Sequence, residues 1–353
     1  MVFQQSVYQK KFVSLKIAIT ADPELPVPPV LYGGIERIIA MLIEGLVNLG
    51  HEVVLFAHKD SVVPCQLIPY AAADNRLKSV VINTIIINKA LLLQKFDIIH
   101  SFGRMAYLLP QMPLNIPILM SYQREPTVSP IKRAVSLSLK NTMSFTGCSD
   151  YITAKIQPFA IANTIHNCVD MSKYSLLTKA SEDAPLVFLG RIEPIKGTHN
   201  AIEIAIKARR KLIIAGNIPI EQADYFKNRI KPFLDDQITY IGAVNDHQKN
   251  ELLGKALALL MPIEWDEPFG IVMIEAMACG TPVLGLNKGA VPEVIEQGIT
   301  GYYADNIEDL IKKVGQIESL DRTKIKSITH DRFSKEVVVK QYISLYQKMI
   351  GSK

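Results

Sequence analysis

Two glutamates, Glu267 and Glu275, flank the stretch of the sequence that is best suited to binding a phosphate. Between them, Gly270 precedes an apolar run that predicts a helix beginning at Ile271. A helix start presents free backbone N–H groups and the positive end of the helix dipole, and a glycine lets an anion approach them closely. We therefore predict that the amides of Ile271 and Val272 bind a phosphate group.

The two glutamates would bind the groups on either side of that phosphate. Glu275 lies about 7.5 Å along the helix from Gly270, at 1.5 Å per residue, which is roughly the reach from a terminal phosphate to a ribose. Its neighbours are apolar, so a carboxylate without a partner would be costly there, and a ribose diol would satisfy it. Glu267 precedes the helix and would face whatever the phosphate carries. The alternative for both glutamates is an ordinary surface position.

Two cations, Arg191 and Lys196, occupy a loop between a predicted strand at Leu186–Leu189 and a predicted helix at Thr198–Ala208. Thr198 is the expected N-cap of this helix. A bidentate guanidinium and a point-charge ammonium can neutralise different oxygens of a diphosphate, so the loop suits a diphosphate ligand. The alternative is a pair of solvated loop cations.

The first half of the chain opens with a predicted βαβ unit, in which the glycine pair Gly33 and Gly34 stands at the start of the helix. The spacing is not Gly-x-Gly-x-x-Gly, so a dinucleotide fingerprint is absent, and a glycine pair by itself is weak evidence for a site. The predicted elements of this half are strands at Lys16–Thr20, Glu52–Ala57, Ile82–Ile87, Phe96–His100 and Ile116–Met120 and a helix at Ile35–Leu49.

Polar side chains near the ends of these strands are weaker candidates for an acceptor site. His100 ends a strand, where ligands bind in α/β sheets, and the alternative is a structural hydrogen-bonding role. Arg124 stands near Lys132–Lys140, which predicts a cationic amphipathic helix. These cations would meet an anionic or lipid acceptor, unless Lys132–Lys140 is an ordinary surface helix.

The Glu-x7-Glu element resembles that of glycosyltransferase family 4, a family of retaining, sugar-nucleotide-dependent enzymes of the GT-B fold. The resemblance continues through Gly289–Ile295 and Gly298–Tyr302 and covers nearly the whole chain. It implies that Arg191 and Lys196 contact the donor diphosphate and that Gly34 faces it from the first domain. It also implies donor contacts from Val244, near the base, and from Phe269, Gly270, Ile271, Val272 and Glu275.

At one position the sequence departs from the family pattern. After the strand at Ile116–Met120 the family usually has Thr-x-His, with the imidazole near the donor sugar, and this chain has Gln123. A glutamine donates and accepts hydrogen bonds, but it cannot become cationic. With this substitution noted, the resemblance implies that Glu267, Arg191, Lys196 and Gln123 form the catalytic group.

The elements together predict an α/β protein of the GT-B fold, with two Rossmann-like domains of doubly wound parallel sheet that face a central cleft. We expect a first, acceptor-side domain at residues 1–170 and a second, nucleotide-sugar-binding domain at residues 171–333. The helix predicted at Ser334–Ile350 has a broad apolar face, and residues 334–353 are expected to cross back to the first domain.

Composition excludes several other classes of protein. The chain has 353 residues, of which 48% are hydrophobic, and its net charge of +5 is too small for a nucleic-acid-binding protein. The four cysteines are scattered, so neither a disulfide framework nor a zinc site is indicated. Without a long apolar run or a signal peptide, we expect a cytoplasmic protein, with contact at the inner face of the membrane as an option.

The predicted function is retaining transfer of a hexose-type sugar from a nucleoside diphosphate donor, with a UDP-sugar expected, to a carbohydrate, lipid-linked or small-molecule acceptor. We expect no cofactor and no required metal, because the sequence lacks an Asp-x-Asp element and cations are placed to neutralise the diphosphate. Two alternatives remain open, a sugar-nucleotide epimerase of the same fold and a sugar-nucleotide-binding protein without turnover.

Overall fold

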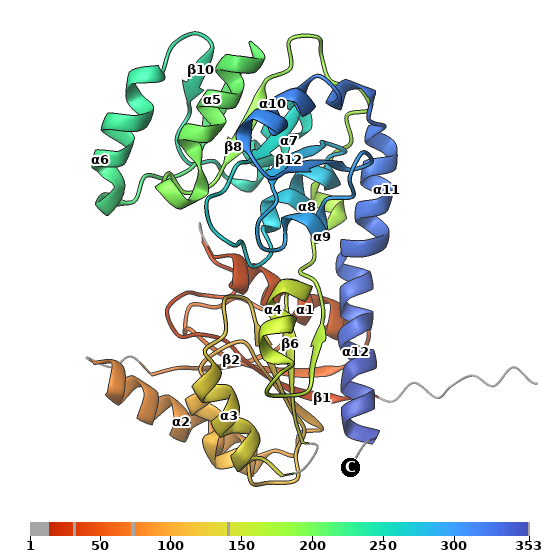
Figure 1. Ribbon diagram of the computed structural model, residues 1–353. Helices are drawn as coiled ribbons and strands as arrows, with labels where there is room; N and C mark the ends of the chain where they lie inside the picture. Colours follow the sequence, from red (N-terminus) through yellow and green to blue (C-terminus); the bar gives the residue numbers. More distant parts are fainter. Residues whose placement is uncertain (1–13, 31–32, 72–74, 140–141, 352–353) are drawn as a thin grey trace, which may run out of the picture.

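The computed structural model describes residues 14–30, 33–71, 75–139 and 142–351. It contains two parallel β-sheets, one in each of two domains that lie one above the other in Figure 1. Residues 1–13, Tyr32 next to the glycine pair and Lys140 of the predicted cationic helix lie outside the described residues. Among the described residues, no helix combines the length and the apolar character needed to cross a membrane.

The first sheet has seven strands in the order β3-β2-β1-β4-β5-β6-β7. Ile17 of β1 lies opposite both Val53 of β2 and Ile98 of β4, so the strand order reverses direction beside β1. In open α/β sheets the carboxyl ends of the strands at such a switch point form a ligand crevice. The strands are β1 (Lys16–Thr20), β2 (Glu52–Ala57), β3 (Gln66–Pro69), β4 (Ile98–Ser101), β5 (Ile118–Tyr122), β6 (Met143–Gly147) and β7 (Ala162–Thr164).

The second sheet has six strands in the order β10-β9-β8-β11-β12-β13, with the same reversal beside β8. Its central strands are apolar throughout, as expected for a sheet that is covered by helices on both faces. The strands are β8 (Leu186–Leu189), β9 (Leu212–Ala215), β10 (Ile238–Tyr240), β11 (Ala258–Met261), β12 (Val283–Leu286) and β13 (Gly301–Ala304). Two such domains facing a cleft constitute the GT-B fold, which confirms the predicted fold class.

Helices connect the strands in both domains. Those of the first domain are α1 (Gly34–Asn48), α2 (Arg76–Leu93), the 3-10 helix η1 (Met105–Gln111), α3 (Val128–Leu137) and α4 (Asp150–Ile156). Those of the second are η3 (Pro194–Lys196), α5 (Thr198–Ala208), α6 (Ala223–Tyr225), α7 (Asp246–Lys255), α8 (Ile271–Ala278), α9 (Val291–Val294), α10 (Ile307–Val314) and α11 (Arg322–Phe333), and α12 (Lys335–Gly351) follows them.

Two local predictions were wrong. Ile82–Ile87, expected as a strand, belongs to helix α2, whose N-cap Asn75 accepts a hydrogen bond from the backbone N–H of Lys78 (2.8 Å). The isoleucines favour a strand locally, but packing of a whole helix against η1 overrides that preference. Thr198 is not the N-cap of α5, because Gly197 (φ 72°) takes that position in a left-handed conformation.

The last two helices connect the domains. Helix α11 packs on α8 of the second domain, whereas α12 packs on α1 of the first domain, as the long blue helices on the right of Figure 1 show. A Cβ atom at Gly45 of α1 would lie 2.5 Å from Val339, so α1 and α12 are in close contact. Several side chains of α12 are part of the apolar core of the first domain, namely Val338, Val339, Tyr342, Leu345, Tyr346 and Met349.

Candidate active site

A cleft of about 1740 Å³ lies between the two domains, at the carboxyl ends of both sheets. With one exception, every residue that the sequence suggested for a site lines this cleft. Those on the first domain are Gly34, Gln123 and Arg124, and those on the second are Arg191, Lys196, Val244, Glu267, Phe269, Gly270, Ile271, Val272 and Glu275. The structure therefore brings together residues that are up to 241 positions apart in the sequence.

Lys196 and Glu267 are in direct contact in this cleft. The Nζ of Lys196 lies 2.6 Å from Oε2 of Glu267, and the indole N–H of Trp265 donates to the same oxygen (2.9 Å). Lys196 also lies over the Trp265 ring, with its Nζ 4.6 Å from the ring centroid. Trp265 fixes both charged groups of the pair, and its position two residues before Glu267 was a signal that sequence reasoning overlooked.

Two glycines hold the backbones of this pair in place. A Cβ atom at Gly197 would lie 1.9 Å from the carbonyl oxygen of Pro262, so only glycine allows the loop carrying Lys196 to approach β11 so closely. A Cβ atom at Gly289 would lie 2.3 Å from the carbonyl oxygen of Glu267. The loop before α9 therefore packs directly on the backbone of Glu267.

Arg191 stands beside Lys196 at the end of β8. Its Nη2 lies 2.8 Å from Oε1 of Glu193, and its side chain is 36% exposed. A guanidinium in this position can reach an anion in the cleft, and the neighbouring carboxylate limits its orientation. Arg191, Lys196 and the start of α8 together form the positively charged part of the cleft.

The start of α8 faces the first domain at short range. Gly270 is the N-cap of α8 with φ 80°, a left-handed conformation that favours glycine. Across the cleft, a Cβ atom at Gly34 would lie 3.2 Å from Cδ1 of Ile271. The N-termini of α1 and α8 thus meet, and both present backbone N–H groups toward the same part of the cleft.

Glu275 has protein partners that were not predicted. Its side chain is buried, and Oε1 accepts hydrogen bonds from the hydroxyl of Tyr174 (2.9 Å) and from Nζ of Lys249 (2.5 Å). The sequence argument that this carboxylate requires a ribose for lack of partners is therefore corrected. Both of these bonds end on Oε1, so Oε2 is the oxygen that a ligand in the cleft would meet.

An ion-pair network connects Glu275 to the first domain. Lys249 lies 3.3 Å from Oδ1 of Asp246, and Oδ2 of Asp246 lies 2.8 Å from Nη1 of Arg37 on α1. Although burial opposes it, the hydrogen bond from Arg37 and the charge of Lys249 hold the pKa of Asp246 below its usual value. Asp246 is therefore charged at neutral pH, and the network spans the cleft.

Acidic side chains line the first-domain side of the cleft, in the loop after β1 and at the start of α1. Burial raises the pKa of Asp22, and the nearby Arg124 (3.2 Å) opposes that shift. Glu24 pairs with Arg104, and burial likewise raises the pKa of Glu36. Sequence reasoning missed these carboxylates: Asp22 and Glu24 lie in a proline-rich stretch without a periodic pattern, and Glu36 lies in the first turn of α1.

His100 is the exception among the candidates, because it does not line the cleft. It is fully buried, and its ring nitrogens hydrogen-bond to the hydroxyls of Tyr346 (2.6 Å) and Ser121 (2.6 Å). Burial lowers the pKa of His100 to about 3, so the ring is neutral. We correct its assignment to the acceptor side, since its contacts give it the structural role of fixing α12 against the first sheet.

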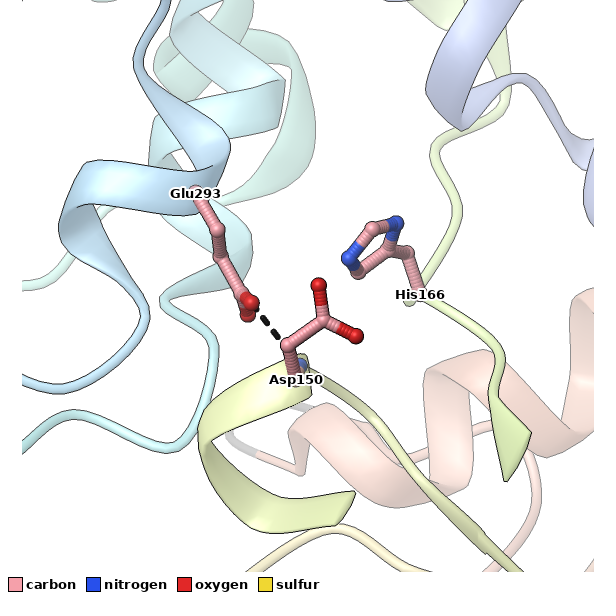
Figure 2. Close-up of side chains that lie close together, drawn as sticks. All are labelled: Asp150, His166 and Glu293. Carbon is pink, nitrogen blue, oxygen red and sulfur yellow. Dashed lines mark hydrogen bonds between the residues drawn. The ribbon is translucent and has the colours of Figure 1, made fainter. Parts of the chain in front are cut away.

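A separate cluster joins the domains outside the cleft (Figure 2). Asp150 at the start of α4, His166 and Glu293 of α9 present ligand atoms within 4.8 Å of one another. The backbone N–H of Asp150 donates to Oε2 of Glu293 (2.8 Å), which ties the first turn of α4 to the second domain. Burial raises the pKa of Glu293 to about 7.

Comparison with known proteins identifies the family. The model of the family "Glycosyltransferase Family 4" matches residues 32–173, and the model of the family "Glycosyl transferases group 1" matches residues 177–336. The spore coat protein SA of Bacillus subtilis is 24% identical over 95% of this chain and 100% of its own length. The N-acetyl-alpha-D-glucosaminyl L-malate synthase of Bacillus anthracis is 24% identical over 55% of this chain and 56% of that protein.

Solved structures share the fold over nearly the whole chain. AviGT4, a glycosyltransferase involved in avilamycin A biosynthesis, has a TM-score of 0.71 and 24% identity, with 96% of this chain and 99% of that chain covered. The Anabaena protein HepE in complex with UDP-glucose has a TM-score of 0.71 and 17% identity, with 95% and 100% covered. Two family models that follow one another along the chain, together with the observed fold, establish that this protein belongs to the family 4 glycosyltransferases of the GT-B fold.

Proposed function

We propose that this glycosyltransferase moves a hexose-type sugar from a UDP-sugar to an acceptor with retention of configuration at the anomeric carbon. The observation that carries the proposal is the contact between Lys196 and Glu267 (2.6 Å) beside the glycine start of α8. A cation for the diphosphate and a carboxylate for the sugar hydroxyls lie next to each other there. A donor whose phosphate meets the amides of Ile271 and Val272 would extend in one direction toward Glu275 and in the other toward Glu267.

In the proposed reaction, the bond between the anomeric carbon and the β-phosphate oxygen breaks while the acceptor hydroxyl attacks from the same face. The proton of that hydroxyl passes to the departing phosphate oxygen, so no protein nucleophile is needed. Negative charge grows on the diphosphate during this step, and Arg191 and Lys196 would stabilise it. Gln123, half-buried after β5, would orient the sugar by neutral hydrogen bonds.

The base and the ribose would lie on the second domain. Val244 lines the cleft in the loop between β10 and α7, where backbone groups are available to a base. Oε2 of Glu275 would accept a hydrogen bond from the ribose, while Tyr174 and Lys249 hold Oε1. Uridine is preferred because HepE, which has the same fold, was solved with UDP-glucose.

The acceptor would enter along the first domain. Asp22, Glu24 and Glu36 line that side of the cleft, and carboxylates of this kind accept hydrogen bonds from the hydroxyl groups of a carbohydrate. The acceptors that fit are a glycan, a lipid-linked sugar or a small hydroxylated molecule. We propose that no divalent metal is required, because two cationic side chains are placed to neutralise the diphosphate.

A donor screen tests the proposal. UDP-, GDP- and ADP-sugars are compared for thermal stabilisation, where a ligand at 100 times its dissociation constant adds about 2.7 kcal/mol to the free energy of unfolding. The stabilising sugar nucleotide is then supplied in radiolabelled form with candidate acceptors, and the anomeric configuration of the product is read by NMR. Stabilisation by GDP- or ADP-sugars alone contradicts the UDP assignment, and an inverted product contradicts retention.

The same assay separates the other functions that the fold allows. An altered sugar nucleotide that forms without acceptor indicates an epimerase, and binding without any product indicates a protein that does not turn the donor over.

Activity measured in the presence of EDTA tests the proposed independence from metal. Complete loss that only Mg²⁺ or Mn²⁺ restores would overturn the proposed independence from metal.

A further inference from the structure

The exposed apolar side chains of this protein are concentrated at one end of the first domain. More than half of the large apolar side chains that are exposed in the described part of the chain lie between residues 77 and 139, although this segment is less than a fifth of the sequence. They belong to α2, η1, α3 and the residues beside these elements. Those on α2, which we call the apolar face of α2, are Leu77, Val81, Ile82, Ile85, Leu92 and Leu93.

The helix geometry places these side chains on one side of α2. Leu77, Val81 and Ile85 follow one another at intervals of four residues, which brings them to the same face of a helix. Asn83 and Ile87, on the other side, are buried against the domain. The side chains of Leu77, Leu92 and Leu93 are 80%, 76% and 75% exposed, so this face is open to solvent at both ends of the helix.

Helices α2 and α3 share one neighbour, the 3-10 helix η1. Both pack on η1, and both lie at the lower left of Figure 1, on the side of the first domain opposite α12. Exposed apolar residues continue from α2 across η1 to α3, through Leu109, Leu114, Val135, Leu137 and Leu139. A surface of this extent is larger than the scattered single apolar residues that are normal on a soluble domain.

The charge around this surface is strongly positive. Between residues 75 and 139 the sequence has eight Lys or Arg and two Asp or Glu, and neither α2 nor α3 contains an acidic residue. Asp97 accepts a hydrogen bond from the backbone N–H of Lys16 (2.7 Å), and Glu125 pairs with Lys155. Two of the cations, Arg104 and Arg124, are paired in the cleft with Glu24 and Asp22. The exposed cations beside the apolar face are Lys78, Lys89, Lys95, Lys132 and Arg133.

Apolar side chains flanked by lysines match one kind of surface particularly well. Leucine and isoleucine insert at the boundary between lipid headgroups and acyl chains, while lysine and arginine are attracted to anionic headgroups. A second copy of this chain would bring two positively charged surfaces together, which is unfavourable. We propose that α2 and α3 dock this protein on the surface of an anionic phospholipid bilayer.

This docking would place the cleft beside the membrane. Asn75, the N-cap of α2, and Ser79 in its first turn both line the cleft, so the cleft opens next to the docked helix. A lipid-linked acceptor could then reach the cleft without leaving the bilayer. The docking itself goes beyond the proposed function, and it needs neither donor nor turnover to be measured.

Vesicle sedimentation of the full chain tests the proposal. Vesicles of phosphatidylcholine with about one-third phosphatidylglycerol are compared with vesicles of phosphatidylcholine alone, at low and at high salt. Binding is expected to the anionic vesicles and to weaken at high salt. Leu92→Glu and Lys89→Glu should each weaken it at least about tenfold, because they place negative charge on the docking surface. All four side chains changed here and in the controls are exposed, so the variants should fold.

Matched controls lie on the second domain. Ile220→Glu changes an apolar side chain that is 94% exposed, and Lys231→Glu changes an exposed lysine, so both should bind vesicles as the wild type does. Equal loss in the controls, absence of binding, or equal binding to neutral vesicles overturns the proposal. Sedimentation velocity without lipid tests the alternative that this surface binds a second copy of the chain. A dimer that Leu92→Glu dissociates, without vesicle binding, assigns the surface to a second copy instead.

Discussion

A Cβ atom placed on Gly34 of α1 would lie 3.2 Å from Cδ1 of Ile271 on α8, although these residues belong to different domains. This is closer than ordinary van der Waals contact, so the two helix N-termini approach each other as closely as a glycine permits. The width of the cleft between these two helix starts is therefore set by the missing side chain of Gly34.

Substitutions of Gly34 should reduce activity in proportion to their size. Gly34→Ala requires Ile271 to shift by a few tenths of an ångström, whereas Gly34→Val adds two more methyl groups at the same place. Overpacking of this kind costs about 1–3 kcal/mol, which corresponds to a loss of roughly 5- to 150-fold in kcat/KM for the valine variant. Gly315→Val is the control, because no atom lies within 4 Å of a Cβ at that position. Equal activity of Gly34→Val and Gly315→Val would show that this approach is not part of the donor site.

Arg191→Ala should weaken the transition state more than the ground state, because charge on the leaving diphosphate grows as the glycosidic bond breaks. Loss of a charged hydrogen bond should cost about 2–4 kcal/mol, or roughly 30- to 1000-fold in kcat. Arg210→Ala, which removes a half-buried arginine paired with Glu318 outside the cleft, is the control. Steady-state kinetics that show only a raised KM for the donor, with kcat unchanged, would refute the proposed role of Arg191.

Glu275→Gln should weaken binding of the bare nucleoside diphosphate, because the ribose is common to all donors of one base and the amide loses the charge-assisted acceptor. Isothermal titration calorimetry with UDP is the measurement. Tyr174→Phe separates binding from structure, since it removes a bond to Oε1 and leaves Oε2 in place. If UDP affinity is unaltered in a folded Glu275→Gln variant, the carboxylate has only the structural role that its contacts with Tyr174 and Lys249 give it.

Gln123 offers a test that distinguishes orientation from charge. Gln123→Ala should lower kcat by leaving groups in the sugar pocket unpaired, whereas Gln123→His should retain substantial activity, because neutral imidazole makes a similar contact. The histidine variant should also acquire a pH dependence between about pH 5 and 8, where imidazole titrates and an amide does not. Wild-type kinetics of Gln123→Ala with every donor would place this residue outside the reaction.

Glu293 should make stability depend on pH. Burial raises its pKa to about 7, so between its ordinary value of 4.5 and about 7 the folded protein holds a proton that the unfolded chain has released. The folded state then binds more protons than the unfolded state, and this contribution to the free energy of unfolding falls as the pH rises through that window. In urea denaturation at several pH values, the free energy of unfolding of Glu293→Gln should fall less steeply with pH than that of the wild type. The control, Glu251→Gln on the exposed side of α7, should follow the wild type; identical pH profiles of all three proteins would refute the assignment.

Much of the fold follows from local patterns, because strands buried on both faces appear as apolar runs of the right length. Lys16–Thr20, Glu52–Ala57 and Leu186–Leu189 were predicted with their observed bounds. Ile82–Ile87 was wrong, because β-branched residues favour a strand in a short window and the eighteen residues of α2 are stabilised by packing that no short window contains. The strand at Gln66–Pro69 was missed, since it is short and only half-buried.

The sequence predicts the site residues that belong to local motifs. It does not predict contacts between residues that lie far apart in the chain. Arg191, Lys196 and Glu267 stand beside glycines at strand and helix ends, and that pattern is visible in the sequence. The partners of Glu275 are not, because Tyr174 lies 101 positions away, close to the predicted boundary between the domains. His100 has the position of a ligand residue but is covered by Tyr346, which is 246 positions later in the chain.

Helix α12 completes the core of the first domain, but it is synthesised only after the whole second domain. Tyr342 and Tyr346 fill the core beneath the first sheet, yet the ribosome synthesises them only after every strand of the second domain. The nascent first domain therefore leaves the exit tunnel with part of its apolar core uncovered until roughly 170 further residues are made, which takes about 10–30 s at ~5–20 residues per second. During that interval the surface of α1 that will receive Val339 is open to chaperones, so the rate of translation elongation bears directly on the yield of folded enzyme.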